Sequence, residues 1–234
     1  MRSVSLAALR SSQPTPRIRL LLLAEVLVFV AALTTYVYLG LPSGEDRTAQ
    51  FVLVPLLAAF PFAMNLIHNE SRKQSGLRLD NLRASAREVA MVLLAAVTVV
   101  GVVGLIAGTW QTSDWERLSG KVLDYVAWGP LQQYVLCAFV FNRLRQALLT
   151  DGAATLGATA LFGLVHSPNW VLVGVTVVFG FVSCRLFRRH PNILTLGLAH
   201  GVLAIVIIYA WPPEWHHGMT IGGVYLHRMA GPLP

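Results

Sequence analysis

Four polar side chains lie in stretches of sequence that are otherwise apolar, namely Gln132, Gln133, His166 and His200. Imidazole exchanges protons near neutral pH, whereas an amide can donate or accept a hydrogen bond but cannot act as a general base. A strongly polar group in an apolar stretch of this kind costs free energy unless it is paired or faces a cavity. Because the four residues come from three separate stretches, we expect them to converge on one polar site.

The two amides also have a structural interpretation, which the residues alone leave open. Gly129, Gln133 and Cys137 fall at i, i+4 and i+8, a stripe of small and polar residues that suits a helix interface or a cavity wall. Amides commonly hydrogen-bond across membrane helices as packing contacts. Gln132 and Gln133 are adjacent, so on a helix they point about 100° apart and face different surroundings.

Polar residues near the ends of the apolar stretches are expected to reach water. Glu25 lies close to the start of the first stretch, where we expect it to reach the surface or to pair with Arg17 or Arg19. A group of histidines near the C-terminus is expected to be solvated and is not predicted to bind a metal. These histidines are His216, His217 and His227.

The composition identifies a membrane protein. Of the 234 residues, 55% are hydrophobic and only 12% are charged, and the mean hydropathy is +0.61, whereas soluble domains carry about 25% charged residues. The net charge of +7 does not indicate nucleic acid, because a membrane protein concentrates basic residues at the inner surface. Cys137 and Cys184 both lie in apolar stretches, so neither a disulfide framework nor a metal site is predicted, and no cofactor is expected.

Seven apolar runs must position the polar residues. They predict an all-α fold, a polytopic membrane helical bundle. We expect this bundle to form a single transmembrane domain over residues 1–234. The fifth run is short and leads into Ser167-Pro168-Asn169, so the fifth and sixth should form a hairpin. The runs are Leu20–Leu41, Phe51–Ile67, Val89–Thr109, Leu123–Phe141, Ala153–Val165, Trp170–Phe187 and Ile193–Trp211.

The distribution of positive charge predicts the orientation. With seven spans, 14 of the 18 Lys and Arg residues fall on one side, which the positive-inside rule assigns to the cytoplasm. The segment 1–19 is then cytoplasmic, the tail 212–234 is external, and the short basic loops suit a bacterial inner membrane. The 14 residues are Arg2, Arg10, Arg17, Arg19, Arg72, Lys73, Arg78, Arg83, Arg87, Arg143, Arg145, Arg185, Arg188 and Arg189.

Three motifs in order resemble the CAAX prenyl protease and bacteriocin-processing (CPBP, or Abi) family of intramembrane proteases. Gln132-Gln133-Tyr-Val-Leu-Cys137-Ala is similar to its Glu-Glu-x-x-x-Arg-Gly motif. The stretch Phe162-Gly-Leu-Val-His166 resembles its Phe-x-x-x-His motif, and the segment that begins at His200 resembles its His-x-x-x-Asn motif. We take residues 123–211, the fourth to seventh predicted helices, as the CPBP-like core.

The resemblance implies an intramembrane endopeptidase, and the departures from it fall on the catalytic positions. In the family the first Glu is understood to activate water, the histidines to position it, and the Asn to stabilise the oxyanion. Here amides replace both carboxylates, Cys137 stands at the Arg position and Ala204 at the Asn position. Losing the carboxylates and the Arg together is coherent, because a buried Arg without a counter-charge is costly.

Two interpretations follow from the resemblance. In one, a histidine takes the proton from water while Gln132 and Gln133 orient the water or donate to the oxyanion, and the protein cleaves a membrane-bound peptide or lipoprotein. In the other, the chain is an inactive relative that binds a lipid or a membrane partner in the same cavity. We expect Phe162, Cys137, Asn169 and Ala204 to support that cavity.

A third hypothesis comes from the two histidines alone. His166 and His200 on facing helices could ligate a haem iron. This hypothesis predicts visible absorption of the purified protein, and a colourless preparation would end it.

Overall fold

The computed structural model describes residues 14–40, 47–112 and 115–230, and these residues form helices and connecting loops without a strand. The helices are α1 (Pro16–Thr35), η2 (Tyr36–Gly40), α2 (Arg47–Ile67), α3 (Leu82–Ala107), α4 (Trp115–Gln133), η3 (Tyr134–Phe141), α5 (Asn142–Leu148), α6 (Asp151–Val165), α7 (Trp170–Arg189), α8 (Ile193–Ala210), α9 (Pro213–His216), η4 (His217–Met219) and α10 (Gly222–Ala230). Here η2 and η3 are π-helical and η4 is a 3₁₀ turn.

Each of the seven predicted runs contains a helix, and the prediction of an all-α polytopic membrane bundle is confirmed. Four helical segments are long and apolar enough to cross a bilayer, and two shorter apolar helices lie at Val52–Ile67 and Asp151–Val165. The fourth run is continuous from α4 through η3 into α5. Leu41, Arg2 and Arg10 lie outside the described residues, as does the side chain of Arg47.

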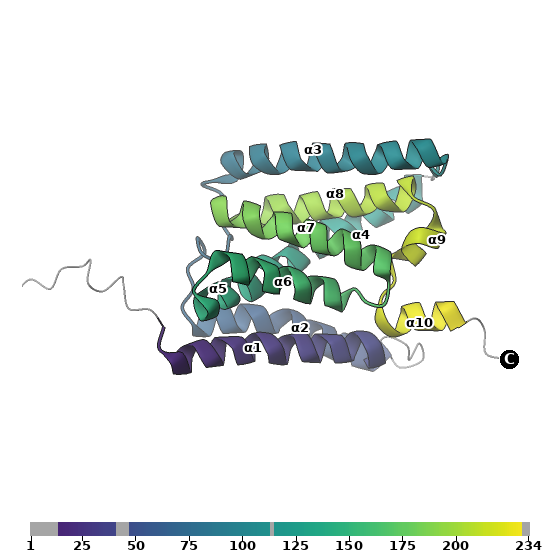
Figure 1. The fold of residues 1–234 in the computed structure, drawn as a ribbon. Helices are drawn as coiled ribbons and strands as arrows, with labels where there is room; N and C mark the ends of the chain where they lie inside the picture. Colours follow the sequence, from purple (N-terminus) through teal and green to yellow (C-terminus); the bar gives the residue numbers. More distant parts are fainter. Residues whose placement is uncertain (1–13, 41–46, 113–114, 231–234) are drawn as a thin grey trace, which may run out of the picture.

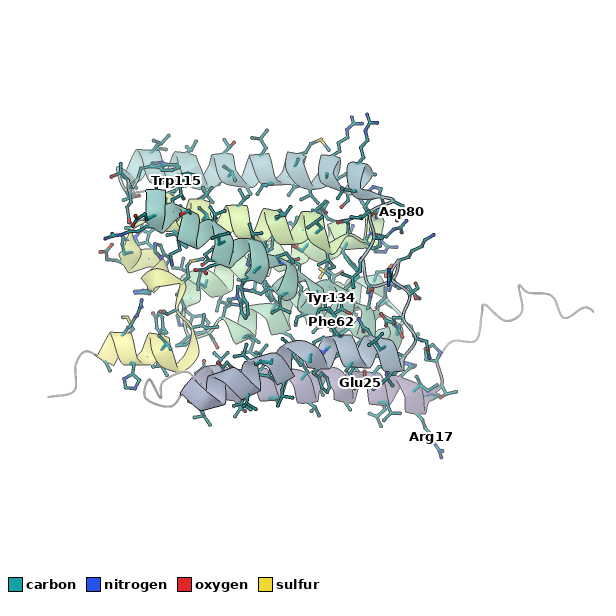
Figure 2. The ribbon with its side chains drawn as sticks, turned by 180° about the vertical axis from the view of Figure 1, so that it is seen from behind. Arg17, Glu25, Phe62, Asp80, Trp115 and Tyr134 are labelled. Carbon is teal, nitrogen blue, oxygen red and sulfur yellow. The ribbon has the colours of Figure 1, made fainter. Side chains whose placement is uncertain are left out.

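The long helices lie side by side with their axes roughly aligned (Figure 1). Figure 1 shows α1 and α2 at one side of the bundle, α3 at the other, and α4, α6, α7 and α8 between them. One end holds the starts of α1, α3, α6 and α8, and we call it the arginine-rich end; the opposite end holds α9 and α10. Arg17 and Asp80 lie at the arginine-rich end, and Trp115 lies at the opposite end (Figure 2).

Side-chain caps begin several of these helices. Thr15 precedes Pro16 at the start of α1, and its hydroxyl accepts from the amide of Ile18. Asn169 begins α7 and Asn192 begins α8, each by accepting a backbone N–H three residues on. These caps satisfy amides that a helix start leaves unpaired, which matters because hydrocarbon offers no water to replace them.

Glycines bring α4 and α8 into backbone contact. A Cβ on Gly129 would collide with the carbonyl oxygen of Gly197, and a Cβ on Gly197 would collide with Pro130. Gly201 faces the carbonyl oxygen of Tyr125, which a Cβ would approach to 2.9 Å. Small residues allow membrane helices to approach this closely, so the predicted stripe that includes Gly129 forms a helix interface.

A charged cluster lies within the bundle near the arginine-rich end. Arg143 is completely buried, and its Nε donates to Glu25 Oε2 at 2.9 Å. Its two terminal nitrogens donate to Glu70 and, at 3.0 Å, to Asn65 Oδ1. His68 Nε2 donates to the other oxygen of Glu25 at 2.6 Å. The cluster ties α1, α2 and α5 together around one guanidinium, and Figure 2 shows Glu25 on α1 close to α2.

The cluster corrects one sequence-based expectation. Glu25 pairs with Arg143 and His68, and not with Arg17 or Arg19, because α5 packs against α1 and brings a buried guanidinium to it. Arg19 instead donates to the carbonyl oxygen of Ala147 at 2.6 Å.

His216 is a second correction, since the tail was expected to be solvated. The side chain is buried, with 3% of its surface exposed, and its Nδ1 accepts from the amide of Gly218 at 3.1 Å. Burial lowers the pKa of His216. The tail folds back onto the bundle because α10 packs against η2 at the end of α1, where Gly222 abuts Val37.

Candidate functional site

A cavity of about 510 Å³ lies between α1, α2, α4, η3, α6, α7 and α8. Most of its wall is apolar, and three of the four sequence-predicted site residues, Gln132, His166 and His200, lie on that wall. The structure therefore brings together polar side chains from α4, from the end of α6 and from α8.

The two adjacent amides have different surroundings. Gln132 lines the cavity, whereas Gln133 is fully buried and is not part of the wall. Gln133 Nε2 lies 3.2 Å from His200 Nδ1, and Cys137 Sγ lies 3.7 Å from Gln133 Oε1. The thiol thus donates to the amide oxygen, which leaves the amide nitrogen to donate to the imidazole.

His200 is held on three sides. The backbone contact of α4 with α8 places Gln133 beside its Nδ1. The rings of Phe179 and Phe162 approach it edge-on, with centroids 5.0 and 6.3 Å away. Because Nδ1 accepts a hydrogen bond from an amide that can only donate there, the neutral ring carries its proton on Nε2.

His166 follows the last residue of α6 and has the opposite tautomer. Its Nδ1 lies 2.7 Å from the carbonyl oxygen of Phe162. A carbonyl oxygen only accepts, so Nδ1 carries the proton and the neutral ring leaves Nε2 with a free lone pair. The Phe162 ring stands at 71° to His166, 4.8 Å between centroids, and also contacts His200.

The four residues predicted to support the cavity occupy two kinds of position. Phe162 and Ala204 lie on the wall. Cys137 is buried behind it, against Gln133. Asn169 is buried at the start of α7, where its Nδ2 donates to the carbonyl oxygens of His216 and Thr220. Asn169 thus joins the turn after His166 to the C-terminal tail.

Sequence reasoning missed several residues of the cavity. The cavity is also lined by Lys121, Asp124 and Tyr125 on α4 and by Thr176 and Phe179 on α7. A helical-wheel projection from Gln132 would have found Tyr125, which precedes it by seven residues, about two turns on the same face. Phe179 could not be found this way, because its contact with His200 depends on how α7 packs.

The site also offers few groups to a metal ion. Within the part of the chain that the structure describes, no three side chains of His, Cys, Asp or Glu gather into a set that could hold one.

The chain was compared with known proteins. No curated protein and no solved structure matches it. The family described as type II CAAX prenyl endopeptidase Rce1-like matches residues 90–206, half of the chain, from α3 to α8. This range holds all three motifs and the helices that carry Gln132, His166 and His200. The protein belongs to the type II CAAX prenyl endopeptidase Rce1-like family of membrane proteases.

Proposed function

We propose that the protein is an intramembrane endopeptidase, or a derived relative of one, that hydrolyses a peptide bond in a membrane-bound peptide or lipoprotein. The observation that carries the proposal is the hydrogen bond from His166 Nδ1 to the carbonyl oxygen of Phe162. It leaves Nε2 of a cavity-wall imidazole available to accept a proton, in a site where both motif carboxylates are replaced by amides.

The two histidines have complementary roles in this proposal. His166 Nε2 is the general base, and His200 Nε2–H is a hydrogen-bond donor to the developing oxyanion. Gln132, on the wall, is a second donor to water or to the oxyanion. Gln133 is a positioning residue, since it contacts His200 from behind and holds its tautomer.

The proposed reaction proceeds in two steps. Water attacks the carbonyl carbon as His166 Nε2 takes its proton, and the carbonyl electron pair moves to oxygen, which accepts from His200. The tetrahedral intermediate then collapses, the C–N bond breaks, and the leaving amine takes the proton from His166. The base is regenerated, and one peptide bond and one water become a carboxyl group and an amine.

A second candidate function is binding without hydrolysis. It is favoured by one observation, that neither Gln132 nor Gln133 can accept a proton from water. In that case the mostly apolar cavity binds a lipid or a membrane-embedded peptide and releases it unchanged.

The experiment measures cleavage of an S-farnesylated, fluorescently labelled CAAX peptide and of a lipid-anchored peptide by the purified protein in liposomes. We expect His166→Ala to reduce kcat by about 10²–10⁴, the usual contribution of a general base, and His200→Ala by about 10²–10³, as for removal of an oxyanion donor. His227→Ala is the matched control, because His227 is exposed on α10.

The two candidate functions predict different results for Gln132→Glu. If the wild-type chain cleaves neither substrate and Gln132→Glu gains cleavage, the chain is a disabled protease that binds without hydrolysis. Cleavage by the wild type that His166→Ala and His200→Ala leave unchanged would rule out the proposed mechanism.

A further inference from the structure

The cavity occupies the half of the bundle that lies away from the arginine-rich end. On α1 and η2 its wall residues run from Phe29 to Val37, in the second half of that segment, and on α8 they run from His200 to Ile207. On α7, which runs in the opposite direction, they run from Leu172 to Phe179, in its first half. Helices of both directions therefore contribute the parts nearer α9 and α10 (Figure 1).

The arginine-rich side of the cavity is closed by packed rings. Phe29 and Val140 form its floor. Behind them the ring of Phe139, fully buried, packs edge-on against Phe29 and Phe60 with centroids 5.4 and 5.9 Å away. The guanidinium of Arg143 lies 5.6 Å from the centre of the Phe139 ring and is itself fully buried. These buried, packed rings lie between the cavity and the charged cluster.

The opposite side of the cavity reaches polar and exposed residues. Lys121 and Asp124, both exposed on the first half of α4, are part of its wall. Met219 and Ile221 of the C-terminal tail are part of it as well. Charged side chains on the wall place this part of the cavity where water reaches.

The tail is anchored beside this opening by the turn that follows His166. Gly222 donates its amide to the carbonyl oxygen of Ser167 at 3.0 Å, and Tyr38 on η2 shares a hydrogen bond of 2.9 Å with the Ser167 hydroxyl. Asn169 holds the tail from the other side of the same turn. The anchored tail and α4 therefore both border the cavity at this end.

We infer that the site opens toward the end of the bundle that carries α9 and α10, and not toward the arginine-rich end. Because basic loops stay in the cytoplasm, this end faces the exterior, and the substrate class is an exported peptide anchored in the outer leaflet. The substrate class rests on the proposed hydrolytic function, whereas the position of the opening does not depend on that function. A volume of about 510 Å³ lies within the usual range of ligand pockets.

Cysteine accessibility tests the inference, since both native cysteines are fully buried and provide an unreactive background. Ala204→Cys and Thr176→Cys place a thiol on the cavity wall. Lys73→Cys and Arg228→Cys, both at exposed positions, mark the arginine-rich end and the opposite end. The probe is a membrane-impermeant, quaternary-ammonium thiosulfonate, added separately to right-side-out and inside-out vesicles.

We expect both cavity thiols to react from the side on which Arg228→Cys reacts, more than about tenfold faster than from the Lys73→Cys side, because a fixed charge does not cross hydrocarbon readily. Reaction from the Lys73→Cys side overturns the inference. So does a lack of reaction at both cavity positions while Arg228→Cys reacts, since the cavity would then be closed. If Arg228→Cys reacts from the cytoplasmic side, the exported substrate class is wrong.

The result is separable from the proposed function. Labelling needs no hydrolysis, so access from the external side survives if the chain proves to be a binding protein. Conversely, peptide cleavage together with access from the Lys73→Cys side would retain the proposed function and remove this inference.

Discussion

The bundle contains two buried polar regions that are built in opposite ways. The charged cluster around Arg143 joins a guanidinium to two carboxylates, and each guanidinium nitrogen has a partner. The candidate site is made of amides and imidazoles, and both of its histidines have an Nε2 that makes no hydrogen bond among those the structure describes. Arg143 and its carboxylates do not line the cavity, whereas His166 and His200 do.

The difference in pairing suggests different tasks for the two regions, with the charged cluster holding helices together and the candidate site being suited to a reaction. A buried charge is tolerated when every donor is paired, and it then holds helices in one arrangement. A neutral polar group can leave one hydrogen-bonding position unpaired at a lower cost in free energy than a buried charge can. A group that exchanges a proton or binds an oxyanion needs such an unpaired position. In this chain Arg143, Glu25 and Glu70 lie in the charged cluster, whereas the motif residues on the cavity wall, Gln132, His166 and His200, are an amide and two imidazoles.

The largest expected effect comes from breaking the charged cluster. Arg143→Leu leaves Glu25 and Glu70 without their counter-charge, and we expect the free energy of unfolding to fall by about 3–5 kcal/mol. Denaturant unfolding in detergent measures it. Arg145→Leu is the matched control, because Arg145 lies over the Phe141 ring, 5.8 Å from its centre, on the same short helix. Equal losses for the two variants would mean that ion pairing in the cluster contributes nothing special.

A smaller effect is expected from the buried amide of the site. Gln133→Leu removes the donor to His200 Nδ1 and should cost about 1–3 kcal/mol, the usual penalty for an unsatisfied buried acceptor. The adjacent Gln132→Leu should cost less, because Gln132 faces the cavity. The same unfolding measurement compares them, and a larger loss for Gln132→Leu would contradict the assignment of the positioning role to Gln133.

The smallest effect is expected from an exposed ion pair. Arg78 Nε donates to Asp80 Oδ1 at 2.6 Å, and this hydrogen bond lowers the pKa of Asp80 below its ordinary value of 3.8. The associated stability is present above pH 3.8 and is lost as the pH falls through the lowered pKa. Asp80→Asn should therefore slightly weaken the dependence of the melting temperature on pH below pH 3.8. At pH 7 it should remove only the small contribution of a solvent-screened ion pair. A loss at pH 7 as large as that of Arg143→Leu would contradict the contrast between the two pairs.

The sequence was sufficient to predict the helices, and three of the four polar residues that it singled out lie on the wall of one cavity. Apolar runs bounded by basic loops fix the helices, because a bilayer admits few other structures. His166 and His200 stood out because polar residues are costly inside such runs. The pairing of Glu25 with Arg143 was missed because the two are far apart in sequence, and only the packing of α5 against α1 brings them together. The burial of His216 was missed for the same reason, since the fold-back of the tail leaves no periodic signal.

The glycine contact between α4 and α8 has a consequence for how this site can change. Backbone meets backbone at Gly129 and Gly197, so the spacing of the two helices does not depend on the size or charge of nearby side chains. Side chains one turn away, such as Gln133 and His200, can therefore be exchanged without moving the frame that carries them. Substitutions at these positions would then change the chemistry of the cavity wall while the spacing of α4 and α8 stays the same.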